Sequence, residues 1–97
     1  MILSFGDDAT RDLFDGLETA RTRRLPPEIR RVAFRRLDAI HHAEELSDLK
    51  SPPGNRLEAL SGSLSGLHSI RINDQWRAVF RWDDGNASEV RVMDYHG

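Results

Sequence analysis

The sequence predicts an α+β fold in the order β-α-α-β-β-β-β, with a mainly antiparallel sheet and two helices packed on one of its faces. Two observations carry this prediction. Apolar residues recur at helical spacing behind Pro26-Pro27, and the second half alternates apolar and polar residues between tight-turn signals. The chain has 97 residues, a length that fits one domain over 1–97.

The first half predicts a short strand and two helices. Residues 2–5 are expected to form the opening strand, and Asp7 or Asp8 to cap a first helix that ends near Gly16. Residues 17–25 are polar and rich in arginine, which is typical of a loop. Pro26-Pro27 then begins the longer helix, because proline is tolerated in a first helical turn. Its apolar stripe should face the core and comprises Ile29, Val32, Ala33, Leu37, Ile40 and Ala43.

One charged residue, Arg36, falls inside this stripe. Its stem can pack while its guanidinium reaches water. Alternatively, it holds a positive charge beneath the functional face of the sheet. The sequence leaves both interpretations open.

Pro52-Pro53-Gly54 ends the helical half, and period-two alternation follows. The predicted strands are residues 56–60, 67–73, 76–82 and 88–93. Asn73-Asp74 and the segment 83–86 supply the turns of two hairpins. The apolar sides of these strands must meet the helices. The opposite sides carry four arginines, Arg71, Arg77, Arg81 and Arg91, which are expected on an exposed sheet face.

These arginines suggest a phosphate-binding surface, although the formal net charge is -2. All basic residues except Lys50 are arginine, whose rigid donor fork suits phosphate groups. The acidic residues concentrate near the start of the chain and in the middle, so a near-neutral total is compatible with a basic face. A solvated polar face is the alternative.

The chain ends in Asp94-Tyr95-His96-Gly97. Histidine can donate or accept a proton near neutral pH. Tyrosine can stack on a base or hydrogen-bond a phosphate. Together with arginines, these groups could promote attack of an RNA 2′-hydroxyl on its own phosphate without a metal. A solvated tail is the alternative.

Composition excludes several other classes. There is no cysteine, so neither a disulfide framework nor a thiolate site is expected. No apolar run approaches membrane length and no signal segment opens the chain, which predicts a cytoplasmic protein. No zinc spacing and no phosphate-binding glycine loop occurs, so no metal and no cofactor is expected.

Four segments together resemble the HigB branch of the RelE toxin superfamily. They are Ile2-Leu3-Ser4-Phe5, the segment from Asp48 to Glu58, the run from Ser69 to Arg77, and the terminal Asp94-Tyr95-His96. The resemblance covers nearly the whole chain. It implies a RelE-like fold and a ribosome-dependent endonuclease that cuts mRNA in the ribosomal A site. It also implies a HigA-like helix-turn-helix antitoxin as partner, in a complex expected to be a heterotetramer.

The resemblance also assigns site residues. His96 matches the family's terminal histidine, with Tyr95 and Asp94 beside it, and Arg77 matches the arginine that holds the scissile phosphate. Arg71 would help to hold the RNA backbone. The further cations expected to contact RNA or the ribosome are Lys50, Arg56, Arg81 and Arg91.

One departure from the family pattern concerns the strand and turn before Gly62. Some HigB toxins place a histidine and a lysine there, where this chain has Glu58 and Ser61. Glu58 can act as a general base, or it can only repel RNA, so a slower or differently selective toxin is expected. Two alternatives to the nuclease follow. One is a ParE-like toxin that binds DNA gyrase, and the other is a degenerate toxin that only binds its antitoxin.

Overall fold

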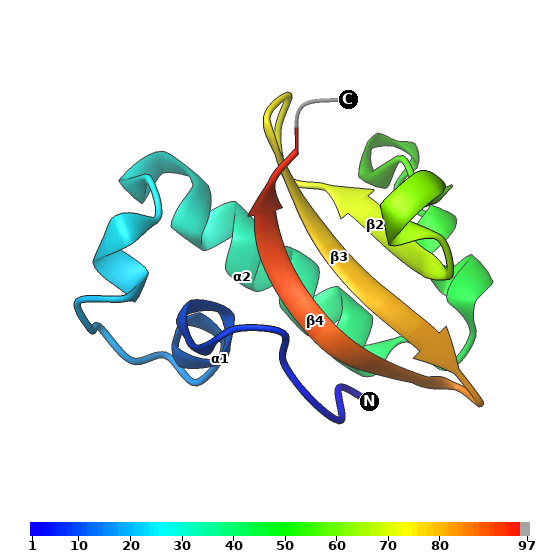
Figure 1. Cartoon of the computed structure of the whole chain (residues 1–97), viewed down its shortest axis with the longest axis horizontal. Helices are drawn as coiled ribbons and strands as arrows, with labels where there is room; N and C mark the ends of the chain where they lie inside the picture. Colours follow the sequence, from blue (N-terminus) through cyan, green and yellow to red (C-terminus); the bar gives the residue numbers. More distant parts are fainter. Residues whose placement is uncertain (96–97) are drawn as a thin grey trace.

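The computed structural model describes residues 1–95, and it contains two α-helices, four 3₁₀ turns and a four-stranded sheet (Figure 1). The helices are α1 (Asp8–Phe14) and α2 (Pro27–His42). The 3₁₀ turns are η1 (Thr22–Arg24), η2 (Leu46–Lys50), η3 (Pro53–Asn55) and η4 (Gly62–Leu64). The strands are β1 (Glu58–Ala59), β2 (Leu67–Arg71), β3 (Trp76–Asp83) and β4 (Asn86–Asp94).

The sheet is antiparallel throughout, in the order β1-β2-β3-β4. Neighbouring strands in space are neighbours in sequence, as the hairpin signals predict. Asp84 and Gly85 both have positive φ, of 49° and 77°, between β3 and β4. Two successive left-handed residues form the kind of two-residue turn that matches the twist of a hairpin.

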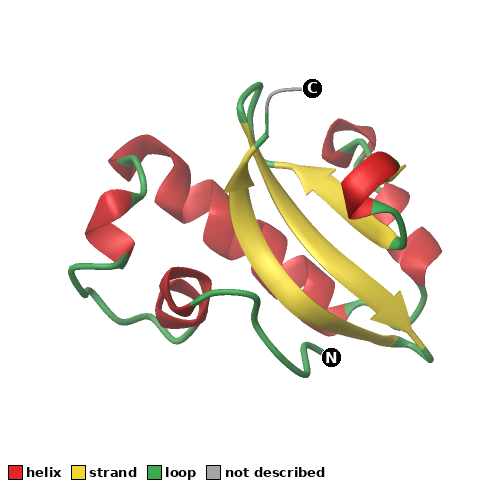
Figure 2. Ribbon diagram, viewed as in Figure 1, coloured by secondary structure: helices red, strands yellow, loops and turns green. Residues whose placement is uncertain are grey.

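Helix α2 supplies the helical side of the core and lies across the back of the sheet (Figure 2). Its residues Ile29, Ala33, Leu37 and Ile40 are buried, and their spacing places them on one stripe. They pack in one apolar cluster with Ile70 of β2, Ala78 and Phe80 of β3, and Ala87, Val90 and Val92 of β4. The predicted stripe and the predicted inner face of the sheet are therefore confirmed.

The first helix is short and is held through its N-terminal half. Asp7 caps it by accepting a hydrogen bond from the Thr10 backbone N–H at 2.8 Å. The buried Thr10 hydroxyl in turn accepts a bond from the backbone N–H of Val92 at 2.9 Å. Helix α1 is thereby joined to the outer edge of β4, the edge that does not pair with β3.

The predicted opening strand over residues 2–5 is wrong as a strand. Ile2 and Phe5 instead make isolated parallel bridges with Ala87 and Val90 of β4. A bulge in β4 explains why no continuous ladder forms: Glu89 has φ 53°, and the β3–β4 register shifts by one residue between Val79 and Arg81. Such a bulge bends the strand and interrupts its pairing.

The strand boundaries also differ from prediction. The segment 56–60 pairs only over Glu58–Ala59, because Arg56 adopts a left-handed conformation just before it. Strand β2 ends at Arg71 rather than at residue 73, since Asn73 turns the chain by accepting bonds from the backbone of Gln75 and Trp76. Strand β4 runs from residue 86 to 94, beyond the predicted 88–93.

The expectation of a fully open second sheet face is also corrected. Ser69 and Val79 point away from α2, yet they are 0% and 1% exposed. Leu60 is also buried, and neither Leu60 nor Val79 belongs to the main apolar cluster. Figure 1 shows the turn that contains η4 on the near side of β2, opposite α2, so residues 56–66 cover part of this face.

Candidate functional site

The site centres on Arg77, near the start of β3 on the sheet face opposite α2. Its side chain is only 11% exposed. Its Nε donates to the hydroxyl of Ser69 on β2 at 2.7 Å, and its Nη2 donates to the backbone carbonyl of Arg56 at 2.6 Å. The guanidinium is thus held by two elements, which fixes its orientation before any ligand arrives.

Glu58 lies beside this guanidinium. One of its carboxylate oxygens is 3.9 Å from Nη2 of Arg77, and the Glu58 side chain is 54% exposed. The register of the sheet explains the proximity: Glu58 is paired with Ser69, which hydrogen-bonds Arg77. A mostly covered cation and an exposed carboxylate therefore meet at the surface.

Arg71 is the second cation of the site. It is the direct cross-strand partner of Arg77, and its guanidinium forms an ion pair with Asp74 in the β2–β3 turn. Like charges in directly opposite positions destabilise a sheet unless each is compensated. Asp74 and Glu58 supply that compensation, one to each arginine.

The C-terminal residues close the same end of the sheet. Asp94 accepts a hydrogen bond from the side chain of Gln75 at 2.9 Å, and the backbone N–H of Tyr95 donates to the carbonyl of Gln75 at 2.7 Å. The tail is therefore joined to the turn that follows Arg71. The predicted catalytic residue His96 lies outside the described residues.

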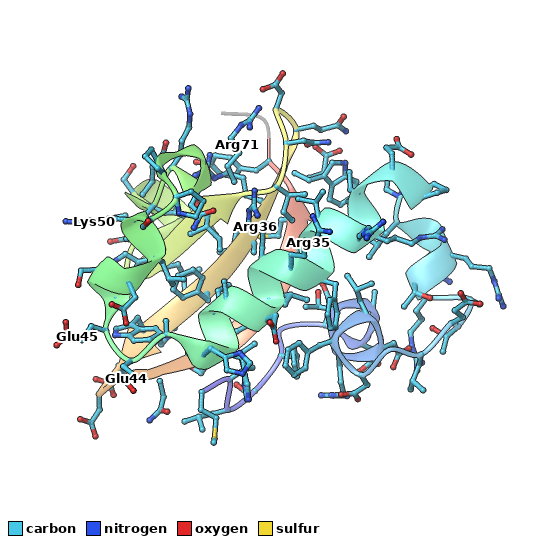
Figure 3. All side chains as sticks on the ribbon, turned by 180° about the vertical axis from the view of Figure 1, so that it is seen from behind. Arg35, Arg36, Glu44, Glu45, Lys50 and Arg71 are labelled. Atoms are coloured by element: carbon cyan, nitrogen blue, oxygen red, sulfur yellow. The ribbon has the colours of Figure 1, made fainter. Side chains whose placement is uncertain are left out.

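The structure does not bring the other predicted cations into this group. Arg81 shares the sheet face but forms an ion pair with Glu89 at 2.6 Å. Arg91 packs its stem at Gly6, where an added Cβ would lie 3.0 Å from its Cδ. Lys50 is exposed at the end of η2 and points away from Arg71 (Figure 3). Arg56 has an exposed side chain, and its carbonyl is the part that contacts Arg77.

Sequence reasoning missed two parts of the site. Ser69 and Arg71 are two residues apart on one strand and share a face, so the position of Ser69 beside Arg77 could have been predicted from the strand register. The position of the Arg56 carbonyl could not have been predicted, because it depends on a left-handed residue with φ 45°.

Other parts of the molecule bear on other chemistries. Within residues 1–95, no group of three histidine, aspartate or glutamate side chains is arranged to hold a metal ion. No helix in that part of the chain is long and apolar enough to cross a membrane. A cavity of about 320 Å³ lies between the end of α1, η1 and α2, with Leu13, Leu17 and Phe34 in its wall. It contains none of the predicted site residues.

A solved structure, the YoeB–YefM complex from Staphylococcus aureus, has a similar fold with a TM-score of 0.60. That match covers 100% of this chain and 99% of the other at 16% identity, so it bears on the fold alone.

The family follows from the sequence comparisons. The family model described as "RelE-like toxin of type II toxin-antitoxin system HigB" matches residues 3–96. The chain is 41% identical over 87 residues to Toxin HigB-1 of Vibrio cholerae, with 90% of each chain covered. An uncharacterized protein of Haemophilus influenzae is 33% identical over 73 residues, covering 75% of this chain and 71% of the other. This chain therefore belongs to the HigB-like toxin family of type II toxin–antitoxin systems.

Proposed function

We propose that this toxin is a ribosome-dependent endoribonuclease that cuts mRNA in the ribosomal A site. The observation that carries the proposal is the fixed Arg77 guanidinium beside Glu58 and opposite Arg71, in a chain of the HigB-like family. The two hydrogen bonds of this guanidinium go to neutral acceptors, so they fix its orientation without neutralising its charge. Such preorganised charge is the main means by which enzymes stabilise phosphoryl transition states.

The proposed reaction needs no cofactor. The 2′-oxygen of one nucleotide loses its proton and bonds to the adjacent phosphorus, while the bond from phosphorus to the 5′-oxygen breaks. The leaving 5′-oxygen takes up a proton, and a 2′,3′-cyclic phosphate remains. Arg77 would bind the non-bridging oxygens as negative charge builds on them.

The remaining roles concern proton transfer and positioning. Glu58 and His96 are the proposed proton-transfer groups, with Glu58 placed 3.9 Å from the Arg77 guanidinium. Tyr95 would stack on a base or bond a phosphate. Asp94, which accepts a hydrogen bond from Gln75, would orient the tail that carries Tyr95 and His96. Arg71 would hold the adjacent backbone, and Lys50, Arg56, Arg81 and Arg91 would add weaker contacts to RNA.

The burial of Arg77 restricts how RNA can reach its guanidinium. With 11% of its side chain exposed, Arg77 can meet a phosphate only through its accessible edge. Residues 56–66 cover part of this face, so the ribosome would have to present the RNA in an extended, unstacked form. This supports dependence on the ribosome, which also supplies most of the binding surface.

The proposed partner is a HigA-like helix-turn-helix antitoxin, in a heterotetrameric complex. The proposed place of action is the cytoplasm, where the ribosomes are. The YoeB–YefM structure is a complex of two proteins, and one of its chains has a fold similar to this one, which supports a protein partner for this chain.

The decisive experiment is a translation reaction with purified ribosomes and one defined mRNA. Cleavage sites are mapped for the wild type, for His96→Ala and for Arg77→Ala. Cuts inside A-site codons, dependent on ribosomes and lost in both variants, are the expected result. Intact mRNA despite growth arrest in cells would instead favour a gyrase-binding toxin. Intact mRNA without growth arrest would favour a degenerate toxin that only binds its antitoxin.

A further inference from the structure

A second group of arginines lies where α2 passes the end of the sheet. Its members are Arg35 and Arg36 of α2 and Arg71 of β2, and this group is called the α2 arginine cluster below. Seen from the helical side, Arg35 and Arg36 lie near the middle of the view with Arg71 above them, well apart from Glu44 and Glu45 at the lower left (Figure 3). Arg35 and Arg36 were not among the predicted site residues.

A hydrogen bond joins the two elements of the cluster. Nε of Arg36 donates to the backbone carbonyl of Arg71 at 2.9 Å. Arg36 is partly buried, so its stem packs along the sheet while its guanidinium reaches the end of β2. The stem therefore packs as the first interpretation expects, and the guanidinium lies at the end of β2 behind Arg71. Within residues 1–95, neither Nη atom of Arg36 makes a hydrogen bond.

The charges of the cluster are poorly balanced. Burial lowers the pKa of Arg36 from its ordinary value, and the neighbouring charges of Arg35 and Arg71 lower it further. In the described part of the chain, the ion pairs include one acid in this region, Asp74 on Arg71, and none on Arg35 or Arg36. An anion bound here would relieve that repulsion.

The side-chain chemistry of the cluster indicates which ligand it would bind. Guanidinium groups form paired hydrogen bonds to phosphate oxygens, and closely spaced arginines suit a chain of phosphodiesters. Arg35 and Arg36 reach the surface on the helical side of the sheet, whereas the Arg71 side chain lies on the opposite face with Ser69 and Arg77. An RNA segment at Arg35 is therefore a different segment from the one that would be cut at Arg77.

We propose that Arg35, Arg36 and Arg71 form a phosphate-binding surface that docks this toxin on ribosomal RNA. Arg71 would link this surface to the cleavage site, since its guanidinium belongs to the site and its carbonyl anchors Arg36. This inference rests on the proposed ribosome-dependent function and adds the element that holds the toxin while mRNA enters the site.

The test measures binding of the folded toxin to purified vacant ribosomes over a series of salt concentrations. The variants are Arg35→Ala, Arg36→Met, which keeps the packed stem, and the double variant. Arg24→Ala is the matched control. Arg24 is an exposed arginine of η1, and its replacement by alanine removes the same single positive charge. A second series replaces the ribosome with a short single-stranded RNA, which represents mRNA.

Each cluster variant is expected to weaken ribosome binding about tenfold and to lower the slope of log affinity against log salt by roughly 0.7 to 0.9. Arg24→Ala should leave both unchanged. Wild-type binding with no difference between the cluster variants and Arg24→Ala would overturn this inference alone. If the cluster variants lose affinity only for the short RNA, this inference would also be overturned, in favour of a contact with mRNA. No wild-type binding to ribosomes would overturn both this inference and the proposed function.

Discussion

Arg71 and Arg77 lie directly opposite each other on β2 and β3, so two guanidinium groups occupy neighbouring positions on one sheet face. Such a pair costs folding free energy, and here each arginine has its own carboxylate, Asp74 or Glu58. An arrangement that must be compensated twice is explained by a use for concentrated positive charge. The use we propose is binding of a phosphate between or beside the two arginines.

Replacing Arg77 by lysine should abolish most cleavage although the charge is kept. An ammonium group cannot donate to Ser69 and to the Arg56 carbonyl in the same geometry while also meeting a phosphate. We expect the cleavage rate on ribosomes to fall about 100-fold or more. Ribosome binding by Arg77→Lys serves as the control and should stay near wild type. A lysine variant that cleaves normally would show that only the charge matters.

Ser69→Ala tests whether the orientation of Arg77 limits the reaction. Ser69 is fully buried and its hydroxyl accepts the bond from Nε, so its loss leaves Arg77 held by one contact. The expected result is a fall in kcat of about tenfold with KM for the ribosome unchanged. Unfolding by urea should show a loss of about 1 kcal/mol. A change in KM alone would contradict a positioning role.

Glu58→Gln separates the two interpretations of that carboxylate. A general base at this position makes cleavage depend on its deprotonated form, so the variant should lose activity and the acidic limb of its pH–rate profile. A carboxylate that only repels RNA gives the reverse, a faster variant with an unchanged profile. We expect the loss, because the exposed Glu58 lies 3.9 Å from the guanidinium that would hold the phosphate.

Ser61→Lys introduces the cation that the resemblance to HigB toxins leads us to expect before Gly62. Ser61 is exposed, so a lysine there can extend into solvent without repacking. One more cation near the phosphate should raise the cleavage rate about tenfold and strengthen growth arrest in cells. Ser63→Lys, two residues further in the same exposed turn, is the control and should change little. An unchanged rate in Ser61→Lys would show that this position does not contact the substrate.

Asp12 should make stability depend on acid pH. Its pKa lies below the ordinary 3.8 because Arg21 donates a hydrogen bond at 2.9 Å and Thr19 another at 2.8 Å. A carboxyl with a lowered pKa in the folded state stabilises the fold above pH 3.8, and this contribution is lost as the pH falls further. Asp12→Asn should be less stable at pH 7, and the difference from wild type should shrink below about pH 4. Thermal melts across pH 3–7 measure this, and a constant difference would contradict it.

The sequence predicted best what depends on local periodicity. The stripe of α2, the two hairpins and the inward positions of β3 all follow from spacing and turn residues. The alternation also placed Arg71 and Arg77 on the same face of the sheet. These features repeat over many residues, so a single irregularity does not hide them.

The errors arise where one residue departs from a regular conformation. Glu89 with positive φ shifts the register of β4 and leaves residues 2–5 with isolated bridges instead of a strand. Left-handed Arg56 shortens β1 and turns its carbonyl toward Arg77. The burial of Arg77 depends on the path of residues 56–66, which no local pattern encodes. One signal of the bulge was present: the buried residues Ala87 and Val90 are three apart rather than two.

The way the first residues lie along β4 has a consequence for how the toxin meets other chains. Ala87 and Val90 exchange backbone hydrogen bonds with residues 1–6, and the N–H groups of Glu89 and Val92 are bound by the hydroxyls of Ser4 and Thr10. The opposite edge, β1, has only two paired residues. Within residues 1–95, neither border of the sheet therefore presents a long unpaired strand on which a second copy could add. The proposed RNA-binding face can then be presented to a partner without the sheet itself seeding aggregation.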